Sequence, residues 1–62
     1  MIVKLKIKNI ISILENIKEF STGTEKLRLV LSNKTTEIDL EDIISYTVYT
    51  DTGSIIEESI EH

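Results

Sequence analysis

The chain has 62 residues, 40% of them hydrophobic and 29% charged, with a formal net charge of −4. This length predicts a single domain, residues 1–62, that buries only about 60% of its unfolded surface. The chain has no cysteine and its only histidine is His62, which excludes a disulfide framework and a zinc site built from His and Cys. No metal or cofactor is therefore expected, and self-association remains as a source of extra stability.

The charge is unevenly distributed along the chain. Residues 1–34 carry a net charge of +4, whereas residues 35–62 carry −8 with no basic side chain. This asymmetry indicates either attraction between the halves, within or between subunits, or an acidic surface for a basic partner. The acidic pI of about 4.8 argues against direct nucleic-acid binding.

The first residues do not have the pattern of a secretory signal, because Val3, Leu5 and Ile7 alternate with three lysines. No segment reaches the roughly 20 apolar residues that span a bilayer. We therefore expect a soluble, cytoplasmic protein with no membrane partner. The strict alternation itself predicts a half-buried strand over residues 3–8.

The next segment has apolar residues at helical spacing: Ile10, Ile13, Leu14, Ile17 and Phe20. This spacing predicts an amphipathic helix over residues 10–20 that is capped by Asn9. Four isoleucines favour the alternative, two short strands separated by a turn at Glu15 and Asn16.

A hairpin is predicted next, because residues 27–31 and 37–40 both alternate with a period of two. A turn at Asn33 and Lys34 would place Arg28 opposite Asp39 and Leu29 opposite Ile38. A longer loop is the alternative, since Lys34 would need a positive φ.

The remaining residues predict a single turn at residues 41–43 and a strand over residues 44–50, with Tyr46 facing inward and Tyr49 outward. Residues 51–54 form a predicted turn, and residues 55–60 are either an edge strand or a helical turn. The resulting fold is α+β: a small, mainly antiparallel sheet with one amphipathic helix, in the order β-α-β-β-β. The alternative is an all-β small barrel, in which the turn at residues 41–43 resembles the short 3₁₀ turn before the last strand of SH3-like barrels.

The sequence Asp51-Thr52-Gly53-Ser54 resembles the active-site signature of aspartic proteases. Those enzymes need two carboxylates that share a proton, and the residue before Asp51 is Thr50, where the family prefers an apolar one. We therefore interpret these residues as a turn, and we assign no catalytic residue.

The sequence as a whole predicts a small non-enzymatic interaction or regulatory protein that binds a partner protein and forms a homo-oligomer. Its bias toward isoleucine, lysine, asparagine and glutamate, without proline, is typical of short proteins from AT-rich bacterial or phage genomes. The alternative is an acidic inhibitor that mimics nucleic acid and blocks a DNA- or RNA-handling protein. The expected partner-binding residues are Tyr49, Glu41, Asp42, Asp51, Glu57 and Glu58. Strand edges at residues 4–8 or 54–60 offer a route to self-association.

Overall fold

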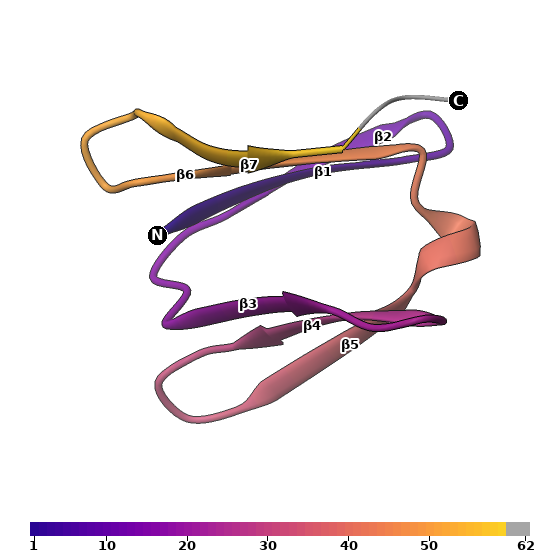
Figure 1. Ribbon diagram of the computed structural model, residues 1–62, viewed down its shortest axis with the longest axis horizontal. Helices are drawn as coiled ribbons and strands as arrows, with labels where there is room; N and C mark the ends of the chain where they lie inside the picture. The colour runs from indigo at the N-terminus through magenta and orange to yellow at the C-terminus, as the bar shows by residue number, and fades with distance from the viewer. Residues whose placement is uncertain (60–62) are drawn as a thin grey trace.

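The computed structural model describes residues 1–59, and these residues form two antiparallel sheets that face each other (Figure 1). The first sheet has the strand order β2-β1-β6-β7 and the second has the order β3-β4-β5. The elements, in chain order, are β1 (Ile2–Ile7), β2 (Ile10–Leu14), β3 (Glu19–Thr22), β4 (Lys26–Val30), β5 (Thr35–Asp39), the 3₁₀ helix η1 (Leu40–Asp42), β6 (Ser45–Tyr49) and β7 (Ile55–Glu58).

The hydrophobic core lies between the two sheets. Its fully buried members are Val3, Leu5, Ile17, Leu27, Leu29 and Val48. They come from both sheets and from the link between β2 and β3, so each sheet contributes one apolar face, as in other face-to-face sheet packings. The half-buried strand predicted over residues 3–8 is confirmed up to Ile7 as β1, in which Val3 and Leu5 are buried and Lys4 is exposed, whereas Lys8 lies in the following turn.

The α+β prediction is wrong: within residues 1–59 the structure is all-β, and the alternative all-β arrangement fits better. The segment predicted to be an amphipathic helix forms β2 and β3 instead. Lys8 and Asn9 form a two-residue turn, in which Lys8 has a φ of 54°, and this turn folds β2 back onto β1. Asn16, with a φ of 60°, interrupts the extended chain before β3.

The preference of isoleucine for strands explains why the helix predicted from the apolar spacing does not form. Isoleucine is β-branched, and its restricted χ1 favours strands over helices. A helix would have buried Ile10 and Ile13 on its apolar face, whereas both are exposed in β2. Only Leu14, Ile17 and Phe20 from that predicted face pack into or against the core.

The hairpin predicted over residues 27–40 is confirmed as β4 and β5, but its register is wrong. Arg28 lies opposite Glu37 rather than Asp39, and Leu29 lies opposite Thr36 rather than Ile38. The loop is longer than two residues, with the Leu31 N–H donating to the Lys34 carbonyl at 2.8 Å. Because the shift is two residues, the inward and outward faces of both strands are unchanged.

Two further expectations about strand edges have different outcomes. Residues 4–8 do not provide an edge, because β1 pairs with both β2 and β6. Residues 55–58 are the edge strand β7, which pairs with β6.

The predicted turn before β6 is confirmed as η1. Ile60 and His62 lie outside the described residues.

Candidate functional site

The β6–β7 hairpin presents the most distinctive surface among the described residues. All four residues of β7 are exposed, and Ile55 and Ile56 keep 58% and 56% of their surface accessible. Tyr49 lies opposite Ile55 in the register, and a shift in pairing follows Val48, so that Glu57 lies opposite Val48. We call Tyr49, Ile55, Ile56, Glu57 and Glu58 the β7 surface.

The structure brings together some of the predicted partner-binding residues and separates others. Tyr49, Asp51, Glu57 and Glu58 all belong to the β6–β7 hairpin. Glu41 and Asp42 lie in η1, at the other end of β6 in Figure 1. The prediction omitted Ile55 and Ile56, although two adjacent isoleucines between a turn and two glutamates are a recognisable signal of an amphipathic edge.

Tyr46 holds β7 against the rest of the molecule. Its backbone N–H donates to the Ser59 hydroxyl at 2.7 Å, and the Ser59 N–H donates to the Tyr46 carbonyl at 2.9 Å. Its phenol donates to a Glu57 carboxylate oxygen at 3.2 Å. The Tyr46 ring contacts Phe20 of β3, with the centroids 5.2 Å apart. The hairpin is therefore anchored through Tyr46, while all four residues of β7 remain exposed. The inward orientation predicted for Tyr46 is confirmed.

This environment changes the acidity of the Tyr46 phenol. Burial raises the pKa of Tyr46, and both the hydrogen bond to Glu57 and the negative charge of that carboxylate raise the pKa further. An interaction with the Thr22 side chain opposes this rise. The phenol therefore stays protonated and able to donate to Glu57 at neutral pH.

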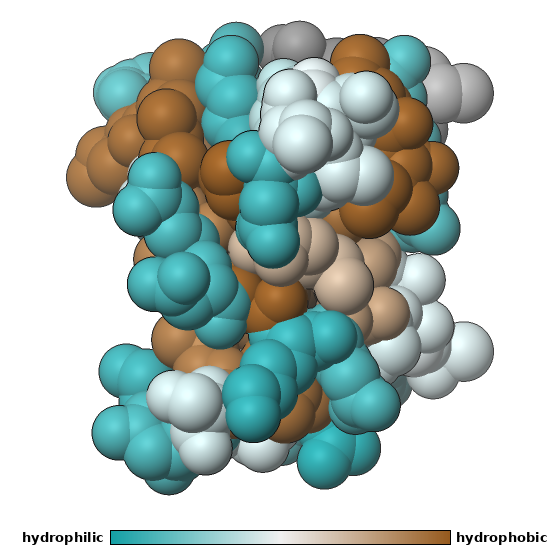
Figure 2. Space-filling model, turned by 90° about the vertical axis from the view of Figure 1, so that its left-hand side faces the viewer, coloured by the Kyte–Doolittle hydropathy of each residue, from teal (hydrophilic) through white to brown (hydrophobic). Residues whose placement is uncertain are grey.

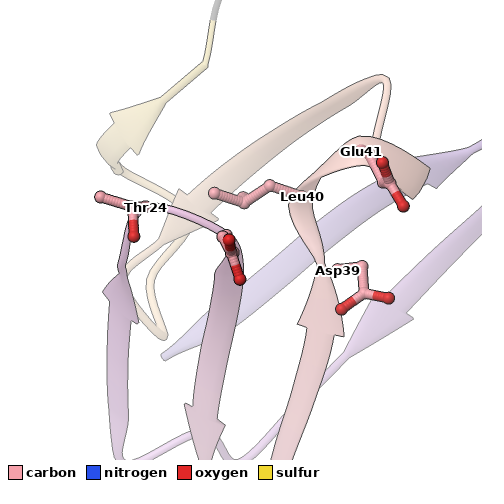
Figure 3. Close-up of a pocket in the computed structure, with 5 residues that line it drawn as sticks. Thr24, Asp39, Leu40 and Glu41 are labelled. Carbon is pink, nitrogen blue, oxygen red and sulfur yellow. The ribbon is translucent and has the colours of Figure 1, made fainter.

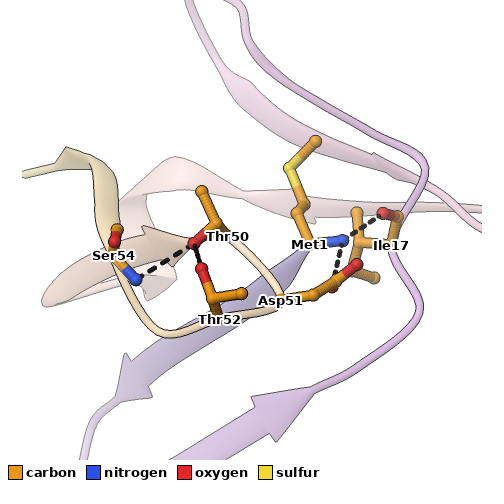
Figure 4. A network of polar contacts seen from close by, with 6 residues as sticks. All are labelled: Met1, Ile17, Thr50, Asp51, Thr52 and Ser54. Carbon is orange, nitrogen blue, oxygen red and sulfur yellow. Dashed lines mark hydrogen bonds and ion pairs between the residues drawn. The ribbon is translucent and has the colours of Figure 1, made fainter.

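The predicted turn at residues 51–54 is confirmed, and it closes the β6–β7 hairpin (Figure 4). The Ser54 N–H donates to the Thr50 hydroxyl at 3.0 Å, and the Thr50 and Thr52 hydroxyls lie 3.0 Å apart. Gly53 has a φ of 96°, a conformation that side chains rarely adopt. These contacts stabilise Asp51-Thr52-Gly53-Ser54 as the turn between β6 and β7.

Asp51 ties the same turn to the start of the chain. Its carboxylate lies 3.0 Å from the Met1 amine, which also donates to the Ile17 carbonyl at 2.9 Å. Figure 4 shows these two interactions converging on one nitrogen atom. The β6–β7 turn, β1 and the link before β3 are thereby connected, although Asp51 remains 83% exposed and such an ion pair stabilises a protein only modestly.

A shallow acidic hollow lies at the other end of the fold (Figure 3). It has a volume of about 420 Å³ and is lined by Thr24, Glu25, Asp39, Leu40 and Glu41. The Leu40 N–H donates to the Glu25 carbonyl at 2.8 Å, which holds η1 beside the β3–β4 turn. Within residues 1–59, no three His, Cys, Asp or Glu side chains are arranged to hold a metal ion. The hollow thus gathers negative charge without forming a chelating site.

Hydrophobic side chains outside the core are concentrated on the first sheet. Figure 2 shows hydrophobic surface on two sides of the upper half of the molecule, with hydrophilic residues between them. The exposed large hydrophobic residues are Ile10, Ile11 and Ile13 of β2 and Ile55 and Ile56 of β7. These strands are the two edges of the first sheet.

Comparisons with protein-family models, with curated proteins and with solved structures found no match. No helix in the described part of the chain is long and apolar enough to cross a membrane.

Proposed function

We propose that this protein is a non-enzymatic interaction protein that binds a partner protein through the β7 surface, and we place it in the cytoplasm. The observation that supports the proposal is that β7 is an edge strand with two exposed isoleucines beside a tyrosine and two carboxylates. An exposed edge offers unpaired backbone groups to an incoming strand, and its side chains add specificity.

The composition of the β7 surface fits a protein partner. Tyrosine is enriched in protein interfaces because its ring contributes apolar area and its hydroxyl contributes a hydrogen bond. Ile55 lies opposite Tyr49, so the two form an apolar centre. Glu57 and Glu58 follow directly along the strand, and a partner with basic residues around an apolar patch would complement them.

The fixed position of the hairpin also favours binding. Tyr46 and Ser59 hold β7 from one side, and the hydroxyl network at Thr50 holds its turn. A surface that is already ordered loses less conformational entropy on association than a mobile segment does. The β7 surface can therefore bind with little rearrangement.

Affinity capture from the source cell tests the proposal with two lysine variants. Ile56→Lys places a charge in the β7 surface, whereas Thr35→Lys places the same charge at an exposed position of β5 in the second sheet. A partner that binds the β7 surface is retained by the wild type and by Thr35→Lys, and binds Ile56→Lys at least about 10-fold more weakly. Equal retention by both variants, or no retained protein, contradicts the proposal.

The same experiment separates the alternative function, an acidic inhibitor that mimics nucleic acid. Asp42 precedes β6 and Asp51 follows it, so these two acidic residues lie at opposite ends of that strand. A mimic would retain a DNA- or RNA-handling protein, and its binding would fall steeply with salt concentration. Binding centred on Tyr49 and Ile55 would change little with salt.

A further inference from the structure

The other edge of the first sheet, β2, has an unusual composition for an exposed strand. Its five residues, Ile10–Leu14, carry no charge, and the three isoleucines are between 57% and 66% exposed. Exposed edges are normally protected by lysine, proline or inward-pointing charges, because an unprotected edge pairs with another chain. Among the described residues, β2 pairs with β1 alone.

The register with β1 determines which residues of β2 can pair with a further strand. Ile7 and Ile10 flank the two-residue turn and are the first pair of the ladder. In an antiparallel ladder, alternate residues direct their N–H and C=O groups toward the neighbouring strand. Counting from that turn, Ile10, Ser12 and Leu14 direct these groups toward β1, whereas Ile11 and Ile13 direct theirs toward the open edge.

A second copy of the same strand satisfies this pattern in one register. An antiparallel copy related by a two-fold axis at Ser12 places Ile11 opposite the second copy's Ile13, and Ile10 opposite the second copy's Leu14. Both outward-directed residues then exchange backbone hydrogen bonds with their counterparts, and every side-chain pair apart from the central serines is apolar. Moving the axis to Ile11 would place Ile13 opposite Asn9 in the turn, and moving it to Ile13 would place Ile11 opposite Glu15.

The charges at the ends of β2 agree with this arrangement. Lys8 precedes the strand and Glu15 follows it, and both are exposed. Antiparallel pairing about Ser12 places Asn9 opposite the second copy's Glu15 and Lys8 opposite the second copy's Asn16, so no two like charges face each other. Cross-strand pairs of opposite charge stabilise a sheet, and like charges destabilise it. The opposite edge, β7, carries two glutamates among its four residues, whereas β2 carries no charge.

We propose that a second copy of this chain binds along β2, antiparallel and about a two-fold axis at Ser12, joining two four-stranded sheets into one continuous sheet. The proposal does not depend on the β7 surface, which remains open in such a dimer. Pairing through one short strand buries less area than the roughly 1,600 Å² of a standard stable interface. The dissociation constant is therefore expected to be on the order of 10 µM rather than nanomolar.

Sedimentation equilibrium of purified protein, from about 1 to about 100 µM, tests the proposal. The wild type is expected to change from monomer to dimer across this range. Ile13→Lys is expected to weaken the dimer at least about 10-fold, because the two-fold axis brings two added charges into the interface. Ile56→Lys, on the other edge, is the matched control and is expected to dimerise like the wild type. A wild type that remains monomeric at about 100 µM, or a control that weakens the dimer equally, overturns the proposal.

A covalent test fixes the register without relying on the lysine variant. The chain has no cysteine, so Ser12→Cys introduces a single thiol at the proposed axis. Directly opposed residues of a non-hydrogen-bonded pair have Cα atoms about 4.5 Å apart, within the range that a disulfide spans. Mild oxidation is expected to produce a disulfide-linked dimer of Ser12→Cys and much less of Thr35→Cys.

Equal cross-linking of both cysteine variants contradicts the two-fold axis at Ser12. Assemblies that grow beyond a dimer with concentration also contradict the proposal, because they indicate head-to-tail pairing of β2 with β7. Because capture of a foreign partner is tested with Ile56→Lys and dimerisation with Ile13→Lys, either proposal can fail while the other holds.

Discussion

Leu29 provides the most direct test of the core. It lies on β4 with none of its surface exposed, and its cross-strand neighbours are Phe20 on β3 and Thr36 on β5. Leu29→Ala removes buried methyl groups and leaves a cavity, which typically costs about 2–5 kcal/mol. A folded chain of this size is stabilised by only about 3–9 kcal/mol, so the substitution is expected to remove a large part of the total stability.

Urea denaturation monitored by circular dichroism measures this loss. Leu29→Ala is expected to lower the free energy of unfolding by about 3 kcal/mol without changing the dependence on urea concentration. Ile55→Ala is the control, because Ile55 is 58% exposed and such substitutions usually change stability by less than about 0.5 kcal/mol. A loss below about 1 kcal/mol for Leu29→Ala, or equal losses for both variants, would refute the burial of Leu29.

Three further predictions concern Tyr46, Asp51 and Lys8. The raised pKa of Tyr46, caused first by its burial and then by Glu57, means that the unfolded chain ionises at lower pH than the folded chain does. Stability is therefore expected to fall as the pH rises above 10.0, the usual value for tyrosine, and urea titrations of Tyr46→Phe should show a smaller fall. Asp51→Asn removes the ion pair with the Met1 amine and is expected to cost less than about 1 kcal/mol at low salt and nothing measurable at about 1 M salt. Lys8 has a φ of 54°, so Lys8→Val is expected to lower the melting temperature relative to Lys8→Gly, and equal melting temperatures would contradict this backbone strain.

The sequence indicated the strands whose alternation is strict. Residues 3–5 and residues 27–29 alternate between buried and exposed positions because a half-buried strand has a period of two, and this signal is local. The turn at Gly53 and the single turn before β6 were also predictable, since turn chemistry depends on a few neighbouring residues. The same local reasoning predicted three of the residues that form the β7 surface: Tyr49, Glu57 and Glu58.

Tertiary pairing decided what local spacing left open. The apolar spacing from Ile10 to Phe20 satisfies a helix and also two strands, and the choice depended on pairing with β1 and β4, which lie outside that segment. The register of β4 with β5 depended on where the loop is centred, and it is centred between Ser32 and Asn33, one residue before the predicted turn. The apolar pattern cannot distinguish these registers, because positions two residues apart share a face. The exposure of Ile11 and Ile13 follows from the same pairing: β2 is placed at the edge of a sheet, so isoleucines that a helix would have buried face outward. Sequence periodicity therefore determined which faces are apolar, and only the assembled sheets determined which of those faces the core covers.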